Sequence, residues 1–200
     1  KQNANRAAGL VRQLLAFSRK QPLKPKLIDV TENFVELSHM LKRILGEQIV
    51  LEFYHGSDLG YIRVDPVQFS QVIINLAVNA KDAMSGSGTL SISTRTETLS
   101  EPYRFGADVI KPGEFVVIDV RDTGCGIPEK YQQSIFQPFF RVDKSRSREY
   151  GGAGLGLSLV WEIADLHGGS VWVEESSDKG TTIAVELPAG TESDSLSVDI

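Results

Sequence analysis

Residues 71–82 read Gln-Val-Ile-Ile-Asn-Leu-Ala-Val-Asn-Ala-Lys-Asp, with two asparagines one helical turn apart. Their helix should begin at residues 65–68, Asp-Pro-Val-Gln, which combine an N-cap acid, a proline at the first helical position and a glutamine at N3. Asn75, Asn79 and Asp82 form a polar stripe beside an apolar face. Because asparagine is a mediocre helix former, the stripe either satisfies neighbouring backbone groups or supplies amide oxygens, which are hard ligands for Mg²⁺.

Two glycine-rich clusters follow this helix. Residues 122–128, Asp-Thr-Gly-Cys-Gly-Ile-Pro, come directly after a predicted strand. They form either a plain turn or a loop whose glycines let the backbone approach a flat ligand, while Asp122 accepts a hydrogen bond from an exocyclic amine. Residues 151–157 open a predicted helix, where unpaired N–H groups and the helix dipole favour an anion. The spacing is neither G-x-G-x-x-G nor Walker A, so this second cluster alone does not define a ligand.

The order of these clusters resembles the ATP-binding domain of sensor histidine kinases. The shared array is an N-x-x-x-N helix, a strand ending in D-x-G-x-G, F-x-P-F at 136–139, G-x-G-L-G-L at 152–157 and Gly180-Thr181 between the last strands. That family belongs with gyrase, the heat-shock 90 chaperones and mismatch-repair ATPases in the Bergerat fold. The resemblance covers about residues 26–188, and its N-terminal part is most similar to bacterial hybrid kinases of the cell-cycle type.

The resemblance implies a role for each matching residue. Asp122 would bind the adenine amino group, and Thr181 would lie close to adenine. Asn79 would coordinate Mg²⁺ and Asn75 would support the phosphates, so these two are the expected catalytic residues and the cofactors are ATP and Mg²⁺. The other expected nucleotide contacts are Asp82, Gly124, Gly126, Ile127, Phe139, Arg141, Lys144, Gly152, Gly154, Leu155, Gly156 and Leu157.

The segment between the two glycine clusters resembles a lid over the nucleotide. Phe136 and Phe139 would anchor it, and its bases would either contact phosphate or form a solvated face; they are Arg141, Lys144, Arg146 and Arg148. Ala153 stands where the family often has threonine, which removes a possible hydroxyl contact but leaves the backbone cradle.

The expected fold is an α+β two-layer sandwich, a mixed sheet covered on one face by three helices, with a long helix before it. We divide the chain into 1–22, the second helix of a dimerisation and phosphoacceptor hairpin with its linker; 23–188, the catalytic ATP-binding domain; and 189–200, an acidic linker tail. The predicted strands are 26–30, 48–54, 61–64, 89–96, 114–121, 170–174 and 181–187, and the predicted helices are 31–45, 65–84 and 155–167, with a long polar loop at 97–113.

Composition excludes several classes of protein. The chain has 200 residues, 41% of them hydrophobic, and a net charge of −5, which argues against binding to the nucleic-acid backbone. The single cysteine, Cys125, cannot form an internal disulfide. No apolar run approaches the roughly 18 residues of a membrane span, so we expect no membrane contact from this fragment and a cytoplasmic location, even where the parent kinase is membrane-anchored.

The implied activity is transfer of the ATP γ-phosphoryl group to a histidine on a hairpin missing from this chain, for relay to a receiver-domain aspartate in a response regulator. The full-length protein would be a homodimer. His39, His55 and His167 lack a phosphoacceptor setting, and we attribute His167 to the favourable dipole at a helix C-terminus. An ATP-driven clamp and a degenerate nucleotide-binding module remain alternatives; Asn75, where hydrolytic relatives have a glutamate base, favours transfer over hydrolysis.

Overall fold

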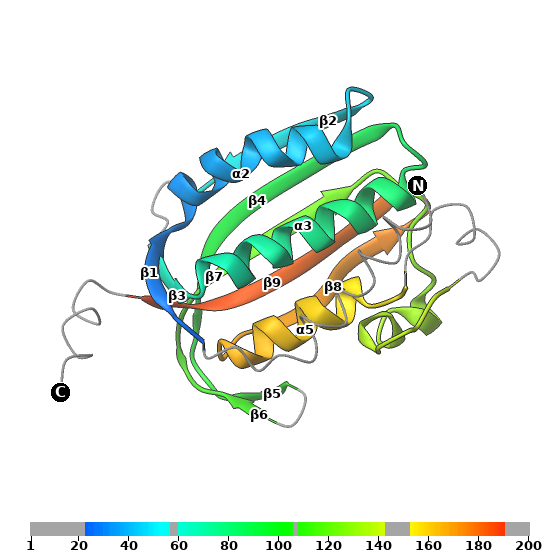
Figure 1. Cartoon of the computed structure of the whole chain (residues 1–200). Helices are drawn as coiled ribbons and strands as arrows, with labels where there is room; N and C mark the ends of the chain where they lie inside the picture. The colour runs from blue at the N-terminus through cyan, green and yellow to red at the C-terminus, as the bar shows by residue number, and fades with distance from the viewer. Residues whose placement is uncertain (1–22, 57–59, 106–107, 143–152, 191–200) are drawn as a thin grey trace.

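A computed structural model describes residues 23–56, 60–105, 108–142 and 153–190, drawn in colour in Figure 1. In chain order the elements are β1 (Lys26–Asp29), α2 (Val30–Leu45), β2 (Ile49–His55), β3 (Tyr61–Val64), α3 (Pro66–Ala83), β4 (Gly88–Leu99), β5 (Tyr103–Phe105), β6 (Asp108–Ile110), β7 (Gly113–Asp122), α5 (Gly156–Leu166), β8 (Ser170–Ser177) and β9 (Gly180–Gly190). Two 3₁₀ turns, Glu129–Tyr131 and Ser134–Phe136, lie between β7 and α5. The predicted helix before residue 22 lies outside the described ranges.

The main sheet is mixed, and its helices lie on one face. Its strand order is β1-β3-β9-β7-β4-β2, with β8 paired to β9. The β2–β4 pair is parallel, and the other pairs in this sheet are antiparallel. Figure 1 shows α2, α3 and α5, the helices of the described part of the chain, over the same face of the sheet. The predicted two-layer α+β sandwich is therefore confirmed.

Helix α3 lies at the centre of the core because its apolar face has the helical period and the strands beneath it have a period of two. Its start is the predicted one: Asp65 caps the helix through hydrogen bonds from the N–H groups of Val67 and Gln68. Ile73 is fully buried, as are Ile92 on β4 and Ile118 on β7. The apolar face of α3 thus packs on the sheet, and the stripe of Asn75 and Asn79 lies on a different face of the helix.

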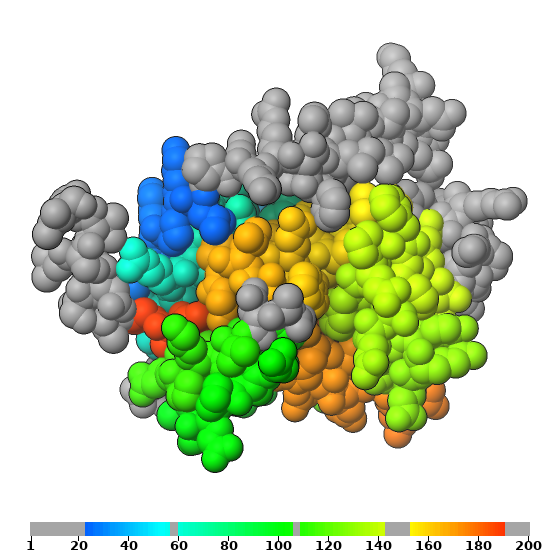
Figure 2. All heavy atoms as spheres, turned by 90° about the horizontal axis from the view of Figure 1, so that it is seen from below, coloured from blue at the N-terminus to red at the C-terminus, as the bar shows by residue number. Residues whose placement is uncertain are grey.

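The predicted loop at 97–113 is wrong, because β4 extends to Leu99 and a short hairpin, β5–β6, fills much of the remainder. Aromatic side chains hold this hairpin against the domain. The Phe105 ring lies 5.3 Å from the Trp161 ring of α5, and the Tyr103 hydroxyl donates to Glu186 at 2.8 Å. Figure 2 shows the green hairpin packed beside α5. Single aromatics in a polar segment give no period, so the sequence analysis missed these strands.

Several element boundaries also differ from the predictions, and β8 continues to Ser177, three residues beyond its predicted end. Strand β9 continues to Gly190, and Ala189 pairs with Ile62 of β3, so residues 189 and 190 belong to the sheet rather than to the tail. Helix α2 begins at Val30, one residue before the predicted start, because the Asp29 carboxylate accepts the N–H groups of Thr31 and Glu32 and so acts as the N-cap.

His167 joins the end of α5 to the start of α3. Its Nε2 accepts the Asp65 N–H at 3.0 Å, which leaves Nδ1 to donate to the Ile163 carbonyl at 2.8 Å. An imidazole that accepts at one nitrogen and donates at the other is neutral. The helix-dipole explanation for His167 is therefore wrong: the side chain is a hydrogen-bonded connection between two helices.

We predict that His167→Ala lowers the free energy of unfolding by about 1 to 3 kcal/mol, because it leaves the partly buried Asp65 N–H without its partner. His39→Ala is the matched control, since His39 is an exposed histidine on α2, and it should change stability by less than about 0.5 kcal/mol. Urea unfolding measures both variants. Equal, small effects of the two substitutions would contradict the role of His167.

Candidate functional site

The polar stripe of α3 faces the first residue of α5. Asn75 is 7% exposed, and its Oδ1 accepts from Gln71 Nε2 at 3.0 Å. Within the described ranges, the Nδ2 atoms of Asn75 and Asn79 are buried and have no hydrogen-bond partner. A Cβ added at Gly156 would lie 3.2 Å from Asn79 Nδ2. The structure thus brings Asn79 and Gly156 together and leaves the Nδ2 groups of the two asparagines without partners among the described residues.

Asp122 ends β7 inside the protein. It is 7% exposed, and its Oδ1 accepts the Gly124 N–H at 2.7 Å. Burial raises the pKa of Asp122, while the backbone N–H groups of Gly124 and Thr181 act in the opposite direction. The carboxylate is therefore held in one orientation, as an acceptor for an exocyclic amine requires.

The glycines after Asp122 are required by the protein's own packing. A Cβ at Gly124 would lie 2.7 Å from Asp122 Oδ1 and 2.8 Å from the Ala83 backbone at the end of α3. Gly126 has φ of +73°, and a Cβ there would lie 1.8 Å from the Ser177 carbonyl. Close approach to a ligand is thus not the only reason for these glycines: they let the loop fit between α3 and the β8–β9 turn.

Thr181 lies beside Asp122. Ser176, which was not predicted as a site residue, connects Thr181 to Ile127. Thr181 is 4% exposed, and its Oγ1 lies 2.9 Å from Ser176 Oγ. Ser176 Oγ also accepts the Ile127 N–H at 2.7 Å. One serine near a turn has no distinguishing pattern, so only the strand register could have pointed to Ser176.

The stem of the predicted lid is held by backbone contacts. The Phe139 N–H donates to the Gly154 carbonyl at 2.8 Å, and Gly154 has φ of +71° with no room for a Cβ. The Phe139 side chain is 65% exposed, so Phe139 holds this stem through its backbone N–H and not through packing of its ring. Phe136 does pack against the core, and the Phe140 ring lies 5.7 Å from the Tyr131 ring.

Arg141 is the predicted phosphate cation that the structure describes, and it lies near the polar stripe. Partial burial raises the pKa of the Asp82 carboxyl, whereas the charges of Lys81 and Arg141 lower this pKa. Arg141 and Asp82 are therefore electrostatically coupled at the rim of the site. Lys144, Arg146, Arg148 and Gly152 lie outside the described residues.

Leu155 and Leu157 point toward the protein. Leu155 is 6% exposed, and its carbonyl accepts from Ser158 Oγ at 3.0 Å. Leu157 packs partly against the core. Any contact of these two residues with a phosphate would therefore come from their backbone N–H groups, which lie in the first turn of α5.

The residues fit Mg²⁺ only together with phosphate oxygens. Among the described residues, no group of three or more His, Cys, Asp or Glu side chains could hold a metal ion. Mg²⁺ is commonly bound by one or two protein oxygens plus phosphates and waters. A half-turn of the Asn79 amide exchanges its oxygen and nitrogen, so a single amide oxygen beside the α5 N-terminus matches that mode.

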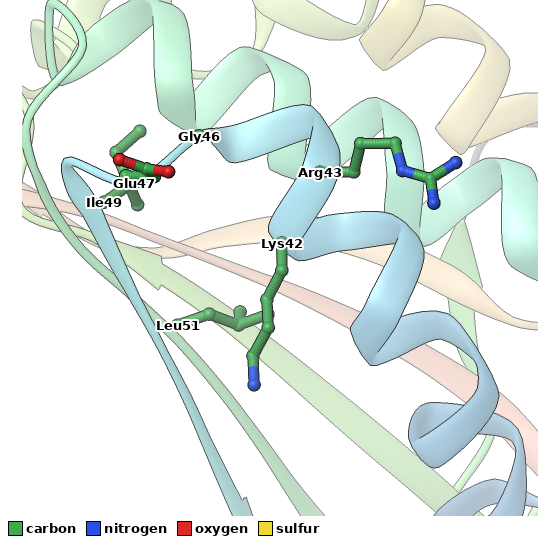
Figure 3. Close-up of a pocket in the computed structure, with 6 residues that line it drawn as sticks. All are labelled: Lys42, Arg43, Gly46, Glu47, Ile49 and Leu51. Carbon is green, nitrogen blue, oxygen red and sulfur yellow. The ribbon is translucent and has the colours of Figure 1, made fainter.

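A separate hollow of about 650 Å³ lies between the end of α2 and β2, lined by Lys42, Arg43, Gly46, Glu47, Ile49 and Leu51. Figure 3 shows Lys42 and Arg43 pointing in different directions from α2, so these two bases do not converge on one ligand. None of the predicted site residues lines this hollow.

A buried carboxylate at the end of one strand, and buried amides opposite a glycine-rich helix start, give this two-layer α+β domain the features of a nucleotide-binding domain. Comparison with known proteins gives the family. Residues 64–191 match the family described as "Histidine kinase-, DNA gyrase B-, and HSP90-like ATPase", and the chain belongs to it.

Several curated relatives are sensor kinases. The chain is 43% identical over 189 residues to "Sensor kinase CckA" of Brucella abortus, covering 94% of this chain and 20% of that protein. It is 36% identical over 128 residues to "Sensor histidine kinase WalK" of Bacillus subtilis, covering 64% of this chain and 19% of that protein. The chain thus spans about a fifth of the length of these relatives.

Solved structures agree on the fold. Full-length ShkA in complex with AMPPNP has a TM-score of 0.75 at 22% identity, covering 95% of this chain and 37% of ShkA. Histidine kinase ThkA in complex with the response regulator protein TrrA has a TM-score of 0.64 at 25% identity, covering 94% of this chain and 49% of the ThkA chain.

The raised pKa of Asp122 predicts a pH-dependent difference in stability between the wild type and Asp122→Asn. A carboxyl whose pKa is higher when folded stabilises the fold while protonated, and this contribution is lost as pH rises through the folded pKa. The amide of the variant stays neutral at every pH, so the wild type should gain stability relative to Asp122→Asn as pH falls from 7 toward 4. Urea unfolding at several pH values measures this, and a pH-independent difference would contradict it.

Proposed function

We propose that this chain is the ATP-binding catalytic domain of a two-component sensor histidine kinase. It passes the γ-phosphoryl group of ATP to a histidine on a hairpin domain, for relay to a receiver aspartate of a response regulator. The observation that carries this proposal is the pair of buried, unpartnered Nδ2 groups of Asn75 and Asn79, the latter beside the glycine start of α5. The sensor-kinase relatives support it.

The site divides its work between two ends. Asp122 accepts the adenine amino group at one end, with Thr181 beside it. At the other end, Asn79 holds Mg²⁺, Asn75 supports the phosphates, and the N–H groups at the start of α5 bind phosphate oxygens. Bound Mg²⁺ neutralises charge that develops on the phosphates. Since phosphoryl transfer depends mainly on positioning and charge stabilisation, this set of residues needs no covalent nucleophile of its own.

Transfer to histidine is favoured over hydrolysis by the residue at position 75. Water attack needs a base that accepts a proton, and a neutral amide does not provide one. Asn75 is further committed through its Oδ1 to Gln71 Nε2. This argues against an ATP-driven clamp, and the intact packing of the glycine loops argues against a degenerate module.

The partners follow from the same proposal. The first partner is the hairpin that carries the acceptor histidine, and this hairpin forms the homodimer of the full-length kinase. A receiver domain is the next partner, as TrrA is for ThkA.

None of the helices in the described residues is long and apolar enough to cross a membrane. We place the domain in the cytoplasm, where ATP and response regulators are found.

Asn79→Ala should weaken ATP binding about tenfold in Mg²⁺, equivalent to about 1.4 kcal/mol, and much less in EDTA, because only the metal-dependent contact is removed. Ser70→Ala is the matched control on the same helix, since its hydroxyl bonds to the Pro66 carbonyl at the far end of α3. Calorimetry in both buffers measures the effect. Equal losses with and without Mg²⁺ would remove the metal role.

The phosphoryl-transfer activity can be tested with labelled ATP and a separate hairpin that carries the acceptor histidine. Acid-labile label should appear on the hairpin and pass to an added receiver domain, while the 200-residue chain stays unlabelled because its three histidines are not acceptors. Asn79→Ala and Asp122→Asn should each abolish transfer. Labelling of the chain itself, or release of inorganic phosphate without transfer, would contradict the proposed function.

A further inference from the structure

Ser176, Thr181 and Asp122 lie in one row across three neighbouring strands. Ser176 of β8 pairs with Thr181 of β9, and Thr181 pairs with Asp122 of β7. Directly paired residues on neighbouring strands point to the same face of the sheet, with Cβ atoms about 4.5 to 5.5 Å apart. This row lies at the end of the sheet and faces the helices, as the buried Ile183 two residues further along β9 does.

A β-bulge in β8 places Ser176, and not Glu175, in this row. The register of β8 against β9 shifts between Val173 and Glu175. Without the extra residue, the pairing of Val173 with Ile183 would continue to place Glu175 opposite Thr181. With it, Glu175 pairs with Thr182 on the other face, where its carboxylate lies 3.7 Å from Arg121 Nη1. The bulge thus keeps a second carboxylate away from Asp122 and puts a hydroxyl there instead.

The Ser176 hydroxyl connects the Ile127 backbone to the Thr181 hydroxyl. Its Oγ accepts the Ile127 N–H at 2.7 Å and lies 2.9 Å from Thr181 Oγ1, and these are its hydrogen-bond partners in the described part of the chain. A hydroxyl carries one proton. If Thr181 donated to Ser176, the Ser176 proton would have to go to water, since Ser176 is partly exposed. If Ser176 donates to Thr181 instead, both protons of the pair stay inside the protein and the Thr181 proton is left to be donated to a ligand.

We propose that Ser176 is a positioning residue that orients the Thr181 hydroxyl as a donor, so that the row presents an acceptor at Asp122 beside a donor at Thr181. This inference rests on the proposed function. Adenine offers the complementary edge, an amino-group donor next to the N1 acceptor. Guanine offers the reverse, a carbonyl oxygen next to an N–H. Ser176 thereby contributes to discrimination between ATP and GTP without touching the nucleotide.

The test is ATP and GTP binding to the 200-residue chain by calorimetry. Ser176→Ala should weaken ATP binding about 3- to 10-fold and GTP binding much less, so the ATP/GTP preference falls. Ser176→Thr keeps the hydroxyl and should restore the preference. Ser177→Ala is the matched control, because the Ser177 hydroxyl accepts the Lys179 N–H within the turn instead of joining the row. Equal losses for both nucleotides in Ser176→Ala would overturn the proposal.

A double-mutant cycle separates orientation from general stability. In a Thr181→Val background, Ser176→Ala should no longer change the ATP/GTP ratio, because the hydroxyl that it orients is gone. Hydrogen exchange of the Ile127 amide should quicken in Ser176→Ala but not in Ser177→Ala, and this readout needs no nucleotide. Additive effects in the cycle would overturn the relay. A wild type that does not bind ATP would instead refute the proposed function, so the two failures are distinct.

Discussion

The antiparallel register of β7 against β9 is the constraint on which the site depends. It pairs Asp122 with Thr181 and lets the buried carboxylate accept backbone N–H groups. Gly180, with φ of +134°, must be glycine, because a Cβ there would lie 1.9 Å from the Asp122 carbonyl. A slip of one residue would turn Asp122 to the opposite face of the sheet, and the loop after it would lose its place against α3.

The glycine-rich loops show how packing and binding share the same residues. Gly124 and Gly126 let one loop pass between α3 and β8, and Gly154 and Gly156 let another pass beside Phe140 and Asn79. These contacts hold both loops in place through the protein's own backbone. Backbone N–H groups that are already fixed lose little entropy when they bind an anion. Packing of the glycine clusters against the fold therefore fixes the backbone N–H groups that the site uses.

The sequence predicts the parts whose signals are local. The N-cap at Asp65, the alternation of β7 and the glycine start of α5 each follow from a few neighbouring residues. The β5–β6 hairpin was missed because Tyr103 and Phe105 find their partners on distant elements. Ser176 was missed because its role depends on a bulge, and a bulge in β8 becomes visible only once its pairing with β9 is known.

The two ends of the site differ in how many of their polar groups have hydrogen-bond partners within the protein. Around Asp122, backbone N–H groups and the Ser176–Thr181 pair form a connected set of hydrogen bonds. On α3, the Nδ2 atoms of Asn75 and Asn79 are buried without partners among the described residues. A buried amide without a partner costs free energy that a ligand can recover. Under the proposed function, base recognition would thus rely on groups fixed before binding, whereas the phosphate end would gain hydrogen bonds when the nucleotide binds.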